Sequence, residues 1–64
     1  MNFYLVDFYP KPAYAKKGLR DITVRVVAND IEQAKQVARA EIQLENPDLD
    51  LHEFDVEVNA PLRV

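Results

Sequence analysis

The first run of hydrophobic residues is apolar at both alternating sets of positions. In an extended chain over about residues 2–9, the two sets would point to opposite sides. A strand that is apolar on both sides usually lies in the middle of its sheet, so we predict a central strand here. The two sets are Phe3 and Leu5 on one side, and Tyr4, Val6 and Phe8 on the other.

Two later runs alternate between apolar and polar positions, over about residues 20–28 and 52–58. This alternation is typical of strands with one face in the core and the other facing water. The first run has Thr23 and Arg25 on its polar side, and the second has Glu53, Asp55 and Glu57. The residues predicted to point inward are Ile22, Val24, Val26 and Ala28 in the first strand, and Phe54, Val56 and Val58 in the second.

Between these two strands, apolar residues recur at the spacing of an amphipathic helix, which we predict over about residues 30–45. Its start fits a capping box formed either by Asn29 with Glu32 or by Asp30 with Gln33. Its end fits a cap at Asn46, because the proline that follows cannot continue a helix. The predicted core stripe is Ile31, Ala34, Val37, Ala38 and Ile42, with Leu44 at its edge.

The order strand, long loop (residues 9–19), strand, helix, strand predicts one α+β domain over residues 1–64. The first two strands form a hairpin, and the helix makes the crossover that leaves strands 2 and 3 pointing the same way. We therefore expect a ββαβ fold, a three-stranded mixed sheet with one helix packed on one face. The doubly apolar strand favours the order 2-1-3, and the order 1-2-3 remains open.

One helix covers only one face of such a sheet, so one apolar side of the central strand must lie on the open face. An aromatic cluster inside a charged rim is the composition of a protein-binding surface or a dimer interface. The alternative is that the long loop and the termini fold over it. The last residues, 59–64, are predicted to fray or to lie along a sheet edge.

Composition narrows the class of protein. No apolar run reaches the roughly 18–20 residues that span a bilayer, and the N-terminus lacks the basic segment of a signal peptide, so we predict a cytoplasmic protein without membrane contact. The net charge of −3 is unevenly spread: residues 1–29 carry five basic against two acidic residues, and residues 30–64 carry three against nine. Such asymmetry concerns binding partners rather than fold.

The inventory of side chains argues against catalysis. The chain has no cysteine and no serine, one threonine and one histidine, so no Ser-His or Cys-His pair can form. With Gly18 as its only glycine it has no glycine-rich phosphate loop, and we expect no cofactor. Asp48, Asp50 and His52 are the one candidate metal-binding set. We favour their interpretation as turn and strand residues, and so expect no metal.

The loop over residues 9–19 is basic and aromatic, whereas the segment from Asp48 to Glu57 is acidic. Lysines and tyrosines of the loop could contact an acidic protein surface, or phosphates and bases. A row of carboxylates could in turn imitate a phosphate backbone, or simply be a solvated face. The predicted partner-binding residues are Tyr9, Lys11, Tyr14, Lys16, Lys17, Arg20, Asp55 and Glu57.

The stretch VRVVANDIEQAKQVARAEI, in which an apolar strand leads through an acidic cap into an alanine-lined helix, resembles a passage in small phage-encoded host-takeover proteins. Within that class the outline, over about residues 20–58, is similar to a podophage inhibitor of host RNA polymerase and to some anti-CRISPR proteins. The resemblance implies a non-enzymatic protein that binds a host macromolecule. The inhibitor uses arginines on its last strand, where this chain has Asp55 and Glu57, so no binding residue is transferred.

Three hypotheses follow. The first, which we favour, is a protein-binding modulator or inhibitor of a host protein or nucleoprotein. The second is a homo-oligomer, such as a dimer, that buries the open sheet face against its own copy. The third is a weak nucleic-acid binder acting through residues 9–20, which the acidic pI of about 4.9 disfavours.

Overall fold

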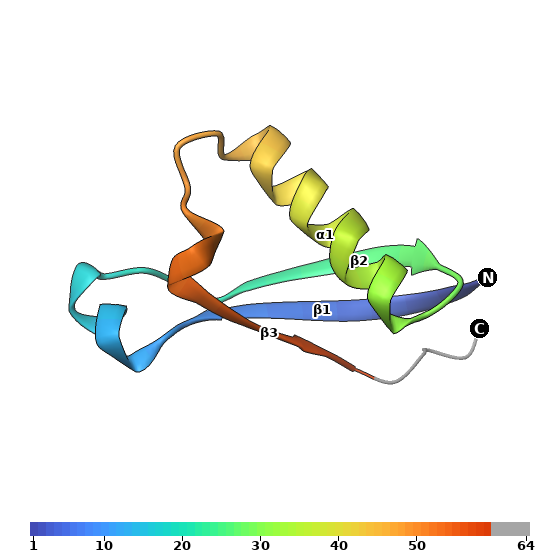
Figure 1. The fold of residues 1–64 in the computed structure, drawn as a ribbon, viewed down its shortest axis with the longest axis horizontal. Helices are drawn as coiled ribbons and strands as arrows, with labels where there is room; N and C mark the ends of the chain where they lie inside the picture. Colours follow the sequence, from blue (N-terminus) through green and yellow to red (C-terminus); the bar gives the residue numbers. More distant parts are fainter. Residues whose placement is uncertain (60–64) are drawn as a thin grey trace.

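A computed structural model describes residues 1–59 of the chain as one sheet with one long helix (Figure 1). The strand order is β2-β1-β3, and both adjacent pairs are antiparallel, so β2 and β3 run in the same direction. The predicted α+β class and strand order are confirmed, but the prediction of a mixed sheet is wrong: with β1 in the middle, the parallel strands β2 and β3 do not pair with each other and every ladder is antiparallel. The elements are β1 (Asn2–Pro10), the 3₁₀ helix η1 (Pro12–Lys17), β2 (Ile22–Ala28), α1 (Ile31–Glu45), the 3₁₀ helix η2 (Leu51–Glu53) and β3 (Phe54–Val58).

The register of the sheet decides which side of β1 faces the helix. Val6 lies opposite Val24 of β2 and opposite Val58 of β3, and all three point toward α1. The even-numbered side of β1 is therefore the core side, and no polar or charged side chain among residues 1–59 is buried with it. The core consists of Tyr4, Val6, Phe8, Val26, Ala28, Ala34, Ala38, Ile42 and Phe54.

The ends of α1 follow the sequence closely. The carboxylate of Asp30 accepts a hydrogen bond from the backbone N–H of Gln33 (2.8 Å), and the side-chain oxygen of Gln33 accepts one from the N–H of Asn29 (2.6 Å). Of the two predicted capping registers, the one with Asp30 and Gln33 is therefore present. At the other end the Asn46 N–H bonds to the carbonyl of Ile42, as expected of a cap residue.

The buried stripe of α1 is narrower than predicted. Ile31 is 51% exposed and Leu44 is 82% exposed, so their assignment to the core stripe is wrong. Leu44 is turned about 200° from buried Ile42, because each helical residue rotates by about 100°. Ile31 is the first residue of α1, and the buried residues of the helix begin three positions later, at Ala34.

Two short helices replace parts of the predicted loop and strand. In η1, Pro12 occupies the first turn, and Gly18 ends it in the left-handed conformation (φ 71°) that glycine adopts without strain. In η2, the Asp50 carboxylate accepts a hydrogen bond from the His52 N–H, which delays the start of β3 from residue 52 to Phe54. The predicted tail lies outside the described residues, apart from Asn59.

Candidate interaction surface

One face of the sheet carries α1, and Figure 1 shows no described element on the opposite face. The loop over residues 9–19 continues beyond the end of the strands and does not fold over this face (Figure 1). We call it the open face. Paired strand residues point to the same side of a sheet, so the register places on it Phe3, Leu5, Asp7, Tyr9, Thr23, Arg25, Val27, Asp55 and Glu57.

The end of the open face near the N-terminus is apolar. Phe3 pairs with Val27 and Leu5 pairs with Arg25, and Val27 is 45% exposed although it is β-branched and apolar. The Arg25 guanidinium lies 5.5 Å from the centroid of the Phe3 ring, a cation–π distance that leaves the arginine's charge at the surface. Phe3 and Leu5 are half-buried.

Asp7 holds the middle of the open face together. Its two carboxylate oxygens accept hydrogen bonds from the Thr23 hydroxyl of β2 (2.7 Å) and the Asn59 side-chain amide (2.8 Å). The carboxylate thus joins the two outer edges of the sheet, and it lies opposite Glu57 in the register. Our sequence interpretation did not select Asp7. The sequence does contain a signal: Asp7 is the one charged residue in a strand that is otherwise apolar on both sides. Because charged residues are rarely buried, Asp7 indicates that the side of β1 with Phe3 faces water.

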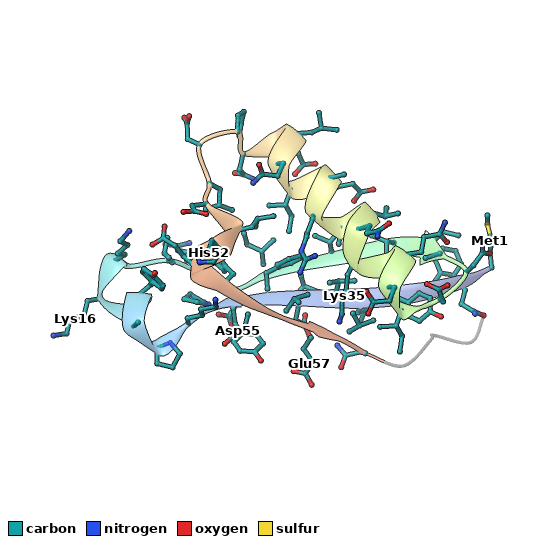
Figure 2. The ribbon with its side chains drawn as sticks, viewed as in Figure 1. Met1, Lys16, Lys35, His52, Asp55 and Glu57 are labelled. Atoms are coloured by element: carbon teal, nitrogen blue, oxygen red, sulfur yellow. The ribbon has the colours of Figure 1, made fainter. Side chains whose placement is uncertain are left out.

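Three of the predicted partner-binding residues lie at the acidic end of this same face. Tyr9 pairs with Asp55, and Glu57 pairs with Asp7. Figure 2 shows Asp55 and Glu57 pointing from β3 to the open side, whereas His52 lies on the side of the helix. The open face is therefore apolar and cationic at one end and acidic at the other.

The basic loop is fastened to the acidic half of the same chain through Glu53. The Lys17 ammonium lies 2.6 Å from the Glu53 carboxylate, and the Glu53 carbonyl accepts a hydrogen bond from the Lys11 N–H (2.9 Å). Lys17 also lies 5.4 Å from the centroid of the Tyr14 ring. The hydrogen bond to Glu53, supported by its negative charge, raises the pKa of Lys17 above the ordinary value of 10.5.

The remaining loop cations are divided between solvent and a small pocket. Lys16 and Arg20 are exposed, and Figure 2 shows Lys16 pointing away from the body of the molecule. Lys11 is half-buried and, with Arg39 and His52, lines a pocket of about 310 Å³. The predicted partner-binding residues thus form two groups, one on the loop and one on the open face, and not a single site.

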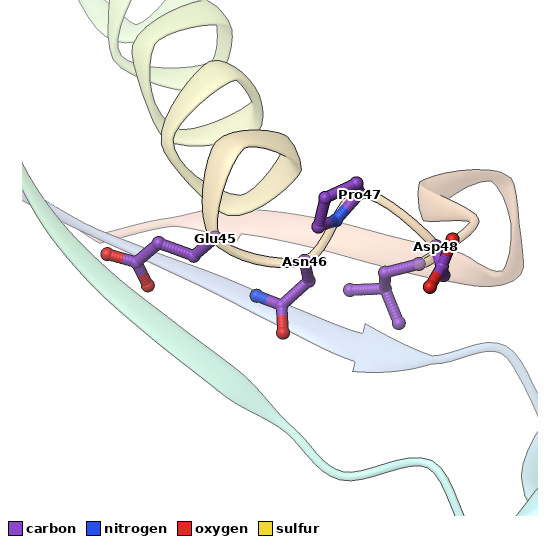
Figure 3. A pocket seen from close by; sticks show the side chains of 5 residues that line it. Glu45, Asn46, Pro47 and Asp48 are labelled. Carbon is purple, nitrogen blue, oxygen red and sulfur yellow. The ribbon is translucent and has the colours of Figure 1, made fainter.

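The acidic turn after α1 shows no arrangement that would hold a metal. A shallow pocket of about 410 Å³ is lined by residues 45–49, and the carboxylates of Glu45 and Asp48 point to opposite sides of it (Figure 3). Asp50 is engaged in capping η2. Within residues 1–59, no three His, Asp or Glu side chains are grouped closely enough to bind a metal ion.

None of the helices in the described part of the chain is long and apolar enough to cross a membrane. Comparisons with protein-family models, with curated proteins and with solved structures find no match to the chain.

Proposed function

We propose that this chain is a protein-binding module that uses the open face of its sheet. The observation that carries the proposal is the apolar end of that face, where exposed Val27 lies beside half-buried Phe3 and Leu5 and the charge of Arg25. Aromatic, aliphatic and arginine side chains are the residues that dominate the centres of protein interfaces, and charged residues form their rims. Here the rim is acidic, at Asp55 and Glu57.

The class of partner is proposed from the resemblance to phage-encoded host-takeover proteins: a host protein or nucleoprotein whose activity the module modulates without chemistry of its own. An acidic rim favours a partner with basic residues around an apolar patch. The loop is the less favoured contact surface, because Lys17 already pairs with Glu53 of the same chain.

The test is affinity capture with immobilised protein from a nuclease-treated bacterial lysate. The double variant Phe3→Thr, Leu5→Thr removes apolar surface from the open face while keeping residues that suit a strand. Ile31→Thr is the matched control, since it removes an exposed apolar side chain from the helix side. We expect one protein to be retained in stoichiometric amount by the wild type and by the control, and lost with the double variant.

Two results would contradict the proposal. Retention of nucleic acid alone, with affinity that falls steeply with salt, would favour the nucleic-acid hypothesis. Sedimentation that reveals dimers of the wild type but not of the double variant, with no foreign protein captured, would favour a homo-oligomer closing the open face.

A further inference from the structure

The outer edge of β2 has free backbone hydrogen-bonding groups, and their positions follow from the ladder. The carbonyl of Leu5 accepts from the N–H of Asn59, and the N–H of Lys11 donates to Glu53, so the backbone of odd residues of β1 faces β3. Even residues of β1 therefore bond to β2, at its own even positions. The N–H and C=O groups of Thr23, Arg25 and Val27 point outward, away from β1, and no backbone hydrogen bond of the described residues reaches them.

This edge lacks the protection that β3 has. Edge strands are usually shortened, charged, bulged or interrupted by proline, since a bare edge pairs with other chains. β3 has five residues and two outward-facing carboxylates, whereas β2 has seven residues, no proline and one charged side chain, Arg25. The Arg25 side chain lies against Phe3 on the open face and leaves the edge itself clear.

A groove runs beside this edge, under the C-terminal half of α1. It has a volume of about 300 Å³ and is lined by Ile22, Thr23, Val24 and Arg25 of β2 and by Glu41, Ile42, Glu45 and Asn46 at the end of α1. Ile22 and Val24 are half-buried and supply an apolar floor. Glu41 and Glu45 are exposed carboxylates on its helix side.

Leu44 does not line this groove: it is 82% exposed and is turned about 200° from Ile42, so it points away from the sheet. Val27, 45% exposed, lies further along β2.

We propose that the β2 edge binds an extended segment of a partner protein as a fourth strand, giving the order partner-β2-β1-β3. This inference rests on the proposed function and specifies its mode. In such strand addition the backbone supplies affinity and alternate side chains supply specificity. Residues of the segment that point toward α1 meet Ile22, Val24 and the carboxylates of the groove, so they are apolar and basic.

The charges favour a foreign segment over a second copy of β2. A two-fold antiparallel pairing of β2 with itself, centred on Arg25, would place Arg25 of one copy opposite Arg25 of the other. Like charges facing across a pair of strands are destabilising. A segment with lysines on its helix side and an acidic residue near Arg25 meets opposite charges at both places.

The probe is the peptide acetyl-VKEITKV-amide, in which lysine, isoleucine and lysine point to one side of the strand. We expect saturable changes in the amide NMR signals of Thr23, Arg25 and Val27 at peptide concentrations up to about 1 mM. The same peptide with a methyl group on the glutamate backbone nitrogen keeps all side chains and loses a ladder donor. Its binding should be weaker by about ten-fold or more.

Protein variants test the same surface. Arg25→Pro removes an outward-facing donor at an edge position that tolerates proline, and Arg25→Ala is its control, lacking the same side chain but keeping the N–H. We expect peptide binding to be lost in the first, and in the second to be weakened only by the loss of the attraction between the Arg25 charge and the peptide glutamate. If Arg25→Pro does not fold, the double variant Glu41→Lys, Glu45→Lys provides a second test. We expect it to weaken peptide binding by about ten-fold, because it reverses the charge of the groove. Glu57→Lys, on the opposite edge strand, should leave peptide binding unchanged.

The inference would be overturned if the peptide did not bind at about 1 mM, or if N-methylation did not weaken its binding. It would also be overturned if the protein formed dimers that Arg25→Pro abolishes, because the β2 edge would then bind a second copy of the chain. The failure of the proposed function is separable from this. If the partner captured from lysate is lost with Phe3→Thr, Leu5→Thr but retained equally by Arg25→Pro and Arg25→Ala, the module binds proteins through its open face and the β2 edge is not used.

Discussion

Ala38 shows how closely the helix approaches the sheet. Its side chain is fully buried, as is that of Ala34 one turn earlier, and the large core residues Phe8 and Val6 come from the strand below. Small residues on the helix and large ones on the sheet allow the two layers to pack closely. A polar atom placed at either alanine has no partner within reach, because no polar side chain of residues 1–59 is buried there.

Replacing Ala38 with aspartate is therefore expected to unfold the domain. Burial of an unpaired carboxylate costs several kcal/mol, against a total stability of about 5 kcal/mol for a domain of this size. Ala40→Asp is the matched control, since Ala40 is exposed on the same helix. Its expected cost is the loss of helix propensity, about 0.5 kcal/mol. Circular dichroism during thermal unfolding measures both, and a cooperative Ala38→Asp transition near that of the wild type would refute the packing of α1.

Asp30 allows a second test at a single position. Its carboxylate accepts the hydrogen bond of the Gln33 N–H at the start of α1, so Asp30→Ala is expected to cost about 1 kcal/mol. Asparagine caps helices about as well as aspartate, so Asp30→Asn should stay within a few tenths of a kcal/mol of the wild type. Urea unfolding measures both differences. Equal losses in the two variants would mean that charge near the helix start, and not the cap, is responsible.

At the level of elements, periodicity carried most of the prediction. The helix bounds, the strand order and the inward positions of β2 and β3 followed from apolar spacing, because burial of one face dictates which residues alternate. The helices η1 and η2 did not, because they depend on local geometry at Pro12, Gly18 and Asp50 and not on a repeating pattern. The pattern does not indicate which side of β1 faces α1, since both sides are apolar.

The surfaces were only partly predictable. Tyr9, Asp55 and Glu57 do lie on the open face, but the pairing of Lys17 with Glu53 joins residues 36 positions apart and leaves no trace in local sequence. The groove beside β2 was missed for a similar reason. Ile22, Val24 and Ile42 fit the core pattern, and the groove that they help to line becomes visible only once β2 is known to be an edge strand.

Hydrogen exchange tests the edge assignment directly. The amides of Val24 and Val26 face β1, whereas those of Arg25 and Val27 face outward. We therefore expect slow exchange at Val24 and Val26 and fast exchange at Arg25 and Val27 in the free protein at low concentration. NMR-detected exchange in deuterated water resolves single amides. Uniform protection along β2 would mean that the outer edge is already paired, and the strand-addition proposal would lose its premise.

Across the whole molecule, the uneven distribution of charge has an internal consequence. The basic loop lies at one end of an elongated body measuring 37 × 21 × 17 Å, next to the acidic segment that leads into β3. Lys17 joins the two, with Glu53 only 14% exposed at its side chain. Part of the loop's positive charge thus holds the loop in place, which leaves Lys16 and Arg20 as its outward-facing cations.

This attachment predicts a dependence of stability on pH. Glu53 raises the pKa of Lys17 above its ordinary value of 10.5, so the folded state binds the proton more tightly than the unfolded state. The stabilisation is therefore fully present below pH 10.5 and is lost as pH rises through the higher pKa of the folded state. Lys17→Gln should lower the melting temperature at neutral pH, and the difference from the wild type should shrink once the pH exceeds that pKa.

Lys16→Gln serves as the control, because it removes the same charge one position earlier from an exposed side chain that forms no ion pair in the described structure. Thermal unfolding of both variants and of Glu53→Gln, with and without added salt, separates a specific pair from general charge. A specific pair makes the Lys17→Gln, Glu53→Gln double variant no less stable than either single variant. Equal effects of Lys16→Gln and Lys17→Gln, both screened by salt, would instead mean that the loop is held by the overall attraction between the two halves of the chain.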